Sequence, residues 1–361
     1  MHRGDLAGAE ATFREALAVR TKSVGEKSPD VVVALNNLGE VLRQQRKLSD
    51  AENLLRQARD MGRELLGDKH PDLAISLHLL GSVLWDRGDR DGAEKLLREA
   101  LAVNRKAFGD ESPAVAHSLT ALASMLKVRR NWVAAEPVLR EALALQRKLT
   151  PNDSVKLENS AFYLAENLNQ QGRHAEADPP YREVLRRRHD RLPAEDNDLL
   201  TVQSMIAGHL TDWAWSERAG PDRAGALQHA LEAERLLREC LATWTRNLPP
   251  TRPAIADTRS RLGGALLAIS VVDPALDAES RLTRLAEVER LMLEGAEALQ
   301  QHRTDPLRFK PRACERLARL YETWETFAPN TGKAAKALEW KQKLTTSDKA
   351  PAGSKPADAP P

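Results

Sequence analysis

Three potential metal ligands lie close together in this chain. His174, Glu176 and Asp178 fall within a few residues of one another. His174 and Asp178, four positions apart, share one face of a helix, but acidic residues at a helix start also complement its dipole. We interpret the three residues as structural and predict no metal-binding residue and no cofactor.

The other reactive residue types form no catalytic arrangement. Gly263-Gly264 lies in a helical pattern without the Lys-Ser/Thr of a phosphate-binding loop, which favours close helix packing. Cys240 and Cys314 are far apart and lack CxxC or Cys/His spacing, as expected of buried thiols in a reducing compartment. The sequence contains no HExxH helix, no GxSxG elbow and no kinase HRD or DFG element. We predict that the chain is not an enzyme and has no catalytic residue.

Charge and hydropathy exclude other classes of partner. The 54 basic and 52 acidic side chains give a net charge of +2, which provides no bulk attraction to nucleic acid or to an acidic membrane surface. No stretch approaches 18 consecutive apolar residues, and residues 1–10 have no apolar signal core. We therefore predict a cytoplasmic protein that binds neither nucleic acid nor membrane.

A period of 42 residues organises the first half of the chain. It is marked by the alanine–acid pairs Ala9-Glu10, Ala51-Glu52, Ala93-Glu94, Ala135-Glu136 and Ala177-Asp178. Periods of this size are typical of stacked helical repeats. Such arrays display a long surface and do not enclose one reactive centre.

Each repeat is expected to form two helices. Ser28-Pro29 is a good helix start, since Ser caps the helix and Pro is tolerated at its first position. One face of this first helix carries the core residues Leu35, Leu38, Gly39 and Leu42. The small residue at Gly39 lets the partner helix approach closely. The second helix is expected to begin near Ser49-Asp50 and to stop near Gly67, which suits a C-cap.

These motifs resemble the tetratricopeptide repeat in its 42-residue form, known from kinesin light chains and bacterial relatives. The resemblance rests on Gly-Asp/Glu-x-Ser/His-Pro before each first helix, on Leu35-Asn36-Asn37-Leu38-Gly39, and on the second-helix pattern of residues 93–100. It implies an all-α, right-handed superhelical solenoid of antiparallel helix pairs. The closing stretches 316–322 and 336–341 also resemble the end of bacterial fusions of such repeats with serine/threonine kinases.

The phase of the repeat divides the chain. Ala233-Glu234 opens another second helix but lies 56 residues after Ala177, so residues were inserted past residue 190. We predict a truncated repeat's orphan second helix at 1–24, a regular array at 25–190, irregular pairs with insertions at 191–345, and a disordered tail at 346–361, whose composition is rich in Pro, Ala and Lys.

The resemblance places ligands on the concave surface that the first helices line. At about 100° per residue, Asn36, Glu40 and Arg43 form a stripe separate from the core stripe. Steps of 42 residues extend this stripe through three further helices. The predicted peptide-binding groove consists of Asn36, Glu40, Arg43, His78, Ser82, Trp85, Thr120, Ser124, Lys127, Phe162, Glu166 and Asn169. This mixture of polar and aromatic residues suits an extended peptide.

We accordingly predict a scaffold that binds a protein or peptide segment, of unknown identity, in its concave groove. One alternative is that the chain is the carboxy-terminal regulatory or substrate-recruiting part of a bacterial serine/threonine kinase, or of another signalling protein, whose catalytic domain lies upstream. Another is self-association through the amino-terminal helix, whose apolar stripe includes Leu6, Phe13 and Leu17.

Overall fold

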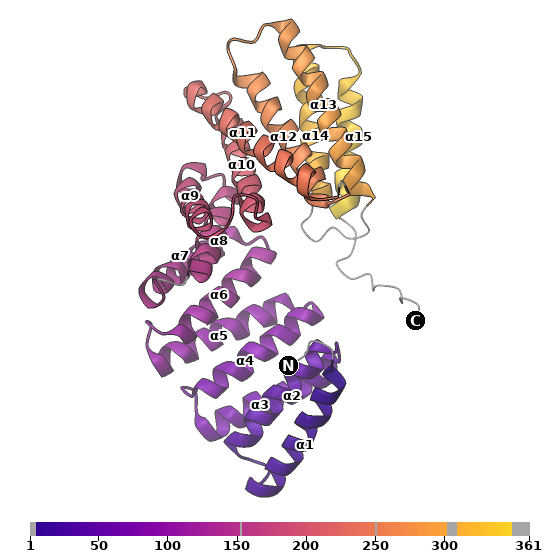
Figure 1. Ribbon diagram of the computed structural model, residues 1–361. Helices are drawn as coiled ribbons and strands as arrows, with labels where there is room; N and C mark the ends of the chain where they lie inside the picture. The colour runs from indigo at the N-terminus through magenta and orange to yellow at the C-terminus, as the bar shows by residue number, and fades with distance from the viewer. Residues whose placement is uncertain (1–4, 152–153, 250, 302–308, 349–361) are drawn as a thin grey trace. The chain divides into compact units, whose positions relative to one another are not determined.

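The chain folds entirely into helices in the part that the structure describes. The structure is a computed structural model that describes residues 5–151, 154–249, 251–301 and 309–348. Within these ranges it forms fifteen α-helices and no strand (Figure 1). The prediction of an all-α repeat fold is confirmed.

The chain divides into two compact units, Met1–Gln171 and Gly172–Pro361. Unit 1 contains α1 (Leu6–Val24), α2 (Pro29–Gln44), α3 (Leu48–Leu66), α4 (Pro71–Arg87), α5 (Arg90–Phe108), α6 (Pro113–Val128), α7 (Trp132–Leu149) and α8 (Ser154–Gln170). Unit 2 contains α9 (His174–Arg191), α10 (Asn197–Glu217), α11 (Arg223–Asn247), α12 (Pro253–Val272), α13 (Ala278–Gln300), α14 (Phe309–Phe327) and α15 (Lys333–Asp348). Of the tail predicted at 346–361, residues 349–361 lie outside the described part of the chain.

Local sequence accounts for the helix ends of unit 1. The Ser28 hydroxyl accepts a hydrogen bond from the Val31 N–H at 3.3 Å, and Ser112 caps α6 in the same way. At the other end, the φ angles of Gly67 and Gly109 are 76° and 77°. Glycine adopts this left-handed region without the steric cost that a Cβ brings. The recurring glycine and Ser-Pro positions therefore set the length of each repeat.

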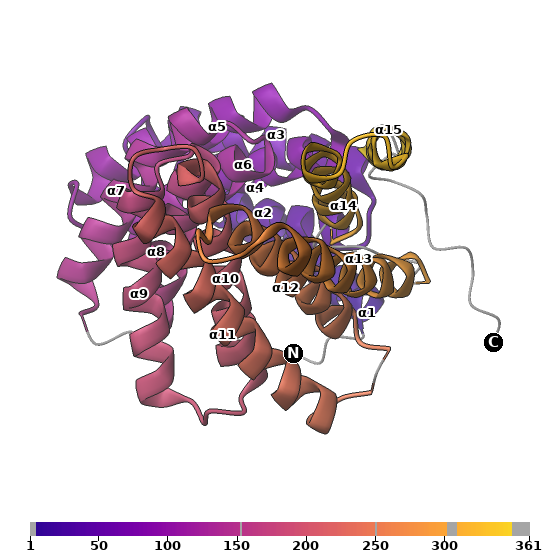
Figure 2. The ribbon, with the colours of Figure 1, turned by 90° about the horizontal axis from the view of Figure 1, so that it is seen from above.

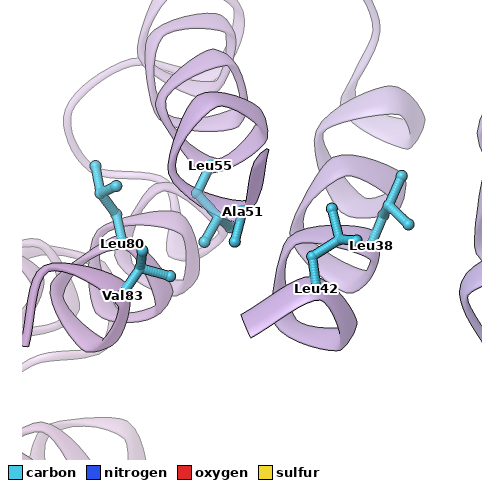
Figure 3. Packing of buried hydrophobic residues seen from close by; sticks show 6 residues of the cluster. All are labelled: Leu38, Leu42, Ala51, Leu55, Leu80 and Val83. Carbon is cyan, nitrogen blue, oxygen red and sulfur yellow. The ribbon is translucent and has the colours of Figure 1, made fainter. Parts of the chain in front are cut away.

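The core of unit 1 joins each helix pair to the next. Leu38 and Leu42 of α2, Ala51 and Leu55 of α3, and Leu80 and Val83 of α4 form one buried cluster (Figure 3). A Cβ on Gly39 would lie only 2.6 Å from the Leu55 Cγ, so the small residue is needed there for the close approach of α3. At Gly81 the nearest atom would be 3.4 Å away, and the next repeat has Ala123 at this position.

The acid of each alanine–acid pair links neighbouring repeats. The alanines Ala51, Ala93 and Ala135 are fully buried. Glu94 binds Arg98 one turn along α5 and Arg129 after the next first helix, α6. Equivalent links join Glu10 to Arg14 and Lys47, Glu52 to Arg56 and Arg87, and Glu136 to Arg140 and Gln171. The 42-residue period of this motif therefore has a packing reason.

Unit 2 is built around α12. This helix lies among α10, α11, α13 and α14 and packs against them (Figure 2). Most of its side chains are buried. Helices α10, α11 and α13 contain 21, 25 and 23 residues, whereas the helices of unit 1 contain 16–19. Longer helices account for the stretched spacing of the motifs past residue 190. No helix in the described ranges has the length and apolar character of a membrane span.

Candidate functional site

Helices α2, α4, α6 and α8, the first helices of four repeats, form a row in unit 1. We call the surface formed by the twelve predicted groove residues the first-helix face of unit 1. Three cross-helix contacts join the row: Arg43 to Asp86 at 2.8 Å, His78 to His117 with ring centroids 5.3 Å apart, and Lys127 to Glu166 at 2.6 Å. Positions that are 42 residues apart in the sequence thus contribute to one surface.

The α2–α4 end of this face is an ion-pair cluster. Arg43 donates hydrogen bonds of 2.8 Å to both carboxylate oxygens of Glu40 and another of 2.8 Å to Asp86. Burial opposes ionisation of Glu40, but hydrogen bonds from Arg43 and Gln44 outweigh it and lower the pKa of this carboxyl. The hydrogen bond to Glu40 likewise raises the pKa of Arg43. The charges of this cluster therefore compensate one another.

The centre of the face consists of rings and hydroxyls. Burial and the neighbouring His117 lower the pKa of His78, so the His78 ring is neutral at pH 7. The Ser82 hydroxyl donates to the His78 carbonyl at 3.1 Å, which leaves its oxygen able to accept a further hydrogen bond. Trp85 is covered on one side by the Arg90 guanidinium, 3.8 Å from the ring centroid.

The α6–α8 end repeats the pattern of paired charge and aromatic rings. Lys127 pairs with Glu166 and also lies 4.4 Å from the centroid of the Tyr163 ring. The Phe162 and Tyr163 rings lie edge to face with centroids 6.2 Å apart. Thr120 and Ser124 donate to carbonyls of their own helix, and Asn169 is half-buried at the end of α8.

Asn36 lies beneath the face. Its side chain is only 4% exposed, and its Oδ1 has no hydrogen-bond partner among the described residues. A buried acceptor without a partner costs about 1–3 kcal/mol. A ligand N–H would recover that cost only after a local shift, because the oxygen itself is buried.

The three potential metal ligands point to different partners. Glu176 binds Arg173 at 2.7 Å and Asp178 binds Arg182 at 3.0 Å, while the His174 ring lies 5.8 Å from the His209 ring. The described residues contain no group of three ligands placed to hold a metal ion.

A buried histidine in unit 2 was not found by the sequence reasoning. The His209 ring is buried against Tyr181, His174 and Trp213, with centroids 4.9–5.8 Å away. Burial, reinforced by His174 and Arg182, lowers its pKa to about 3. The signal was available in the repeat register, where Val41, Val83 and Met125 occupy the equivalent positions.

Unit 2 also has a concentration of arginines on its own first helices. Arg261 of α12 and Arg316 of α14 share the single carboxylate of the buried Asp257. Arg218, directly after α10, and Arg319 of α14 both lie over the Trp215 ring, 4.7 and 4.8 Å from its centroid. The sequence reasoning named none of these arginines as a site.

Comparisons with known proteins agree with this geometry. Residues 1–64, 57–106 and 72–148 match the family model of the tetratricopeptide repeat. The nearly identical TPR-like repeats of a candidate kinesin light chain from Podosopora anserina are similar in structure, with a TM-score of 0.50 and 21% identity over 61% of this chain and 98% of that one. Aspartyl phosphate phosphatase F from Bacillus subtilis has a TM-score of 0.51 and 11% identity over 100% of this chain and 88% of that one. No curated protein matches the chain. At these identities the two structures show a shared fold.

Proposed function

We propose that this chain, whose residues 1–148 belong to the tetratricopeptide repeat family, is a non-enzymatic scaffold that binds an extended protein segment along the first-helix face of unit 1. The observation that carries the proposal is the row of cross-helix contacts from Arg43 to Glu166, which joins the first helices of four repeats and includes at least one predicted residue in each contact. A row of this kind presents repeated, similar positions to a ligand that is itself repetitive, and the backbone of an extended peptide is such a ligand.

The length of the row suits a short peptide. Packed helices lie about 8–10 Å apart, so four first helices span roughly 30 Å. An extended chain advances about 3.3 Å per residue, and roughly nine residues would therefore cross the row. The half-buried Ser82 and Asn169 supply polar atoms for its backbone amides, and Phe162 supplies apolar surface for a side chain.

The charges of the face point to a neutral ligand. Arg43 is paired with Glu40 and Asp86, and Lys127 is paired with Glu166, all at 2.6–2.8 Å. A ligand carboxylate would have to compete with these pairs. We therefore propose that the segment is recognised through amide groups and apolar side chains.

The test introduces bulk on the face without disturbing its ion pairs. Ser82→Arg and Ser124→Arg each place a long side chain among the proposed contacts. Ser49→Arg, at an exposed position of α3, is the matched control. Partners captured from a lysate by the wild type and by Ser49→Arg should be lost with the double variant. Equal recovery by all three proteins would refute this face as the binding surface.

A cytoplasmic location is part of the same proposal and is supported by two free, buried cysteines, as expected in a reducing compartment. A role as the carboxy-terminal regulatory or substrate-recruiting part of a serine/threonine kinase or another signalling protein, and self-association through α1, remain predictions from the sequence. In the structure, Phe13 and Leu17 of α1 pack against the buried cluster that contains Leu38 and Leu55.

A further inference from the structure

We propose that unit 2 carries a second binding site, for an anionic segment of polypeptide, at a cluster formed by Trp215, Arg218, Arg316 and Arg319. We call these residues the Trp215 cluster. The site is independent of the first-helix face of unit 1, and the ligand chemistry it requires is different.

Two guanidinium groups lie over the same indole ring, and neither is paired with a carboxylate of the described residues. Arg218, directly after α10, lies 4.7 Å from the Trp215 ring centroid and donates a hydrogen bond of 2.6 Å to the Trp215 carbonyl. Arg319 of α14 reaches the same ring at 4.8 Å. Within the described ranges neither guanidinium forms an ion pair with an acidic side chain. The ring face attracts each cation, but it does not remove the repulsion between the two.

A third arginine adds to this positive charge. Arg316 lies one turn before Arg319 on α14, and it donates to Asp257 at 3.2 Å and to the Ser260 hydroxyl at 3.0 Å. The same carboxylate accepts from Arg261 at 2.6 Å, so the buried Arg261 and the half-buried Arg316 share one acid. Gly208 provides the space for this arrangement, because a Cβ there would lie 2.4 Å from the Arg261 Nη1.

Few acids compensate these arginines. Besides Asp257, Asp212 of α10 acts on Arg316 through its charge. The nearby Glu217 accepts from the Trp213 indole N–H at 2.7 Å and lies 3.5 Å from His229. Arg218, Arg261, Arg316 and Arg319 thus carry two more charges than Asp212 and Asp257 together, and one more when Glu217 is counted.

An oxyanion is the ligand that suits this arrangement. Guanidinium groups bind carboxylate and phosphate oxygens through paired N–H donors, and the Trp215 ring holds two of these groups near each other. Helices α10, α12 and α14 are the first helices of unit 2 and pack in a row, α10 on α12 and α12 on α14. An extended segment crossing this row would bring an acidic or phosphorylated side chain to the Trp215 cluster.

The experiment compares three labelled ten-residue peptides that share a Gly-Ser backbone. One carries three glutamates, one a phosphoserine and one three glutamines, and fluorescence polarisation measures their affinity for the full chain. We expect at least one anionic peptide to bind about tenfold or more tightly than the glutamine peptide, as charge-assisted hydrogen bonds allow. Whichever anionic peptide binds identifies carboxylate or phosphate as the preferred group.

Matched variants separate the cluster from general charge. Arg218→Gln/Arg319→Gln should weaken anionic peptide binding about tenfold. Arg235→Gln/Arg290→Gln removes the same charge from exposed positions on α11 and α13, and should change it less than about twofold. If the first double variant does not fold, Arg319→Gln alone replaces it, since the Arg319 guanidinium forms no hydrogen bond or ion pair with the described residues and lies over the ring.

Two results would overturn the proposal. One is that neither anionic peptide binds more tightly than the glutamine peptide, even if inorganic phosphate alone binds. The other is that both double variants lose affinity equally, which would indicate unspecific charge attraction.

Discussion

The first-helix rows of the two units share a helical design but differ in charge. In unit 1, Arg43 and Lys127 are paired with Glu40, Asp86 and Glu166 across neighbouring helices. In unit 2, Arg218 and Arg319 face a tryptophan ring, and Arg261 shares its only carboxylate with Arg316. The comparison teaches that the core positions of a repeat determine how helices stack, while the outward positions remain free to vary in chemistry.

The second helices differ between the units in a related way. In unit 1, Glu94 binds both Arg98 in its own helix and Arg129 after the next first helix. Among the described residues of unit 2, the equivalent Glu234 binds Arg238 in its own helix and no residue of the next repeat. The link between repeats is therefore absent at Glu234, whereas Glu289 of α13 binds Tyr321 of α14 and Lys333 and Lys336 of α15.

The largest expected contrast concerns two helical glycines. A Cβ on Gly295 of α13 would lie 2.6 Å from the Ala256 carbonyl oxygen, a backbone atom that cannot move alone. Gly295→Ala should therefore lower the free energy of unfolding by about 3 kcal/mol. A Cβ on Gly62 of α3 would have a Val32 methyl group at 3.6 Å as its nearest neighbour, which is ordinary contact. Gly62→Ala should therefore raise the free energy of unfolding by about 0.5–1 kcal/mol. Urea denaturation of both variants measures these changes, and equal losses would contradict the difference in packing.

The next contrast is pH dependence. The pKa of His209 falls from 6.5 to about 3 on folding, through burial, His174 and Arg182. Below pH 6.5 the unfolded chain binds a proton that the folded chain does not, so stability falls by about 1.4 kcal/mol per pH unit. By pH 5 unit 2 should lose about 2 kcal/mol, and the lowered pKa of His174 acts in the same direction.

His209→Met tests this pH dependence, because Met125 occupies the equivalent position in unit 1. Hydrogen exchange at pH 7.5 and 5.0 measures the protection of the amides of α9–α11 separately from those of unit 1, so the loss of stability near His209 can be distinguished from any loss in unit 1. The acid-induced loss of protection should shrink in the variant. An unchanged loss would assign the pH dependence to the neighbouring His174 and not to His209.

A smaller contrast is expected for the two equivalent acids. Glu94→Ala leaves Arg98 and Arg129 without a shared partner and should cost about 1–2 kcal/mol. Glu234→Ala removes one pair within a helix, between the half-buried Glu234 and the exposed Arg238, and should cost less than about 0.5 kcal/mol. Thermal unfolding of both variants measures the two losses of stability. Equal shifts of the two transition temperatures would contradict the predicted difference.

The smallest effect is that of salt on a ligand of unit 1. Because the charges of the first-helix face are paired internally, raising NaCl from about 50 to 300 mM should change affinity there less than about twofold. Binding of an anionic peptide to the Trp215 cluster should weaken clearly over the same range. A strong salt dependence at the first-helix face would show that its ion pairs open to bind charge.

Sequence periodicity predicted most of the fold and part of the candidate site. Leu35, Leu38 and Leu42 are buried as expected, and the first-helix positions at Arg43, His78 and Lys127 lie next to partners from neighbouring helices. Asn36 was assigned to the same stripe from its angle alone, yet its side chain is buried. An angle on an isolated helix does not show how deeply the next helix covers that position.

The sequence by itself determined that this chain is a stack of helix pairs, because apolar residues and Ser-Pro and glycine signals recur locally at a constant interval. The tertiary structure alone decided which charges meet. Arg218 and Arg319 are brought to one ring from helices about a hundred residues apart, and no period relates them. Local patterns specify helices through short-range hydrogen bonding and packing, whereas the pairing of long side chains depends on the distance between helices that the complete core sets.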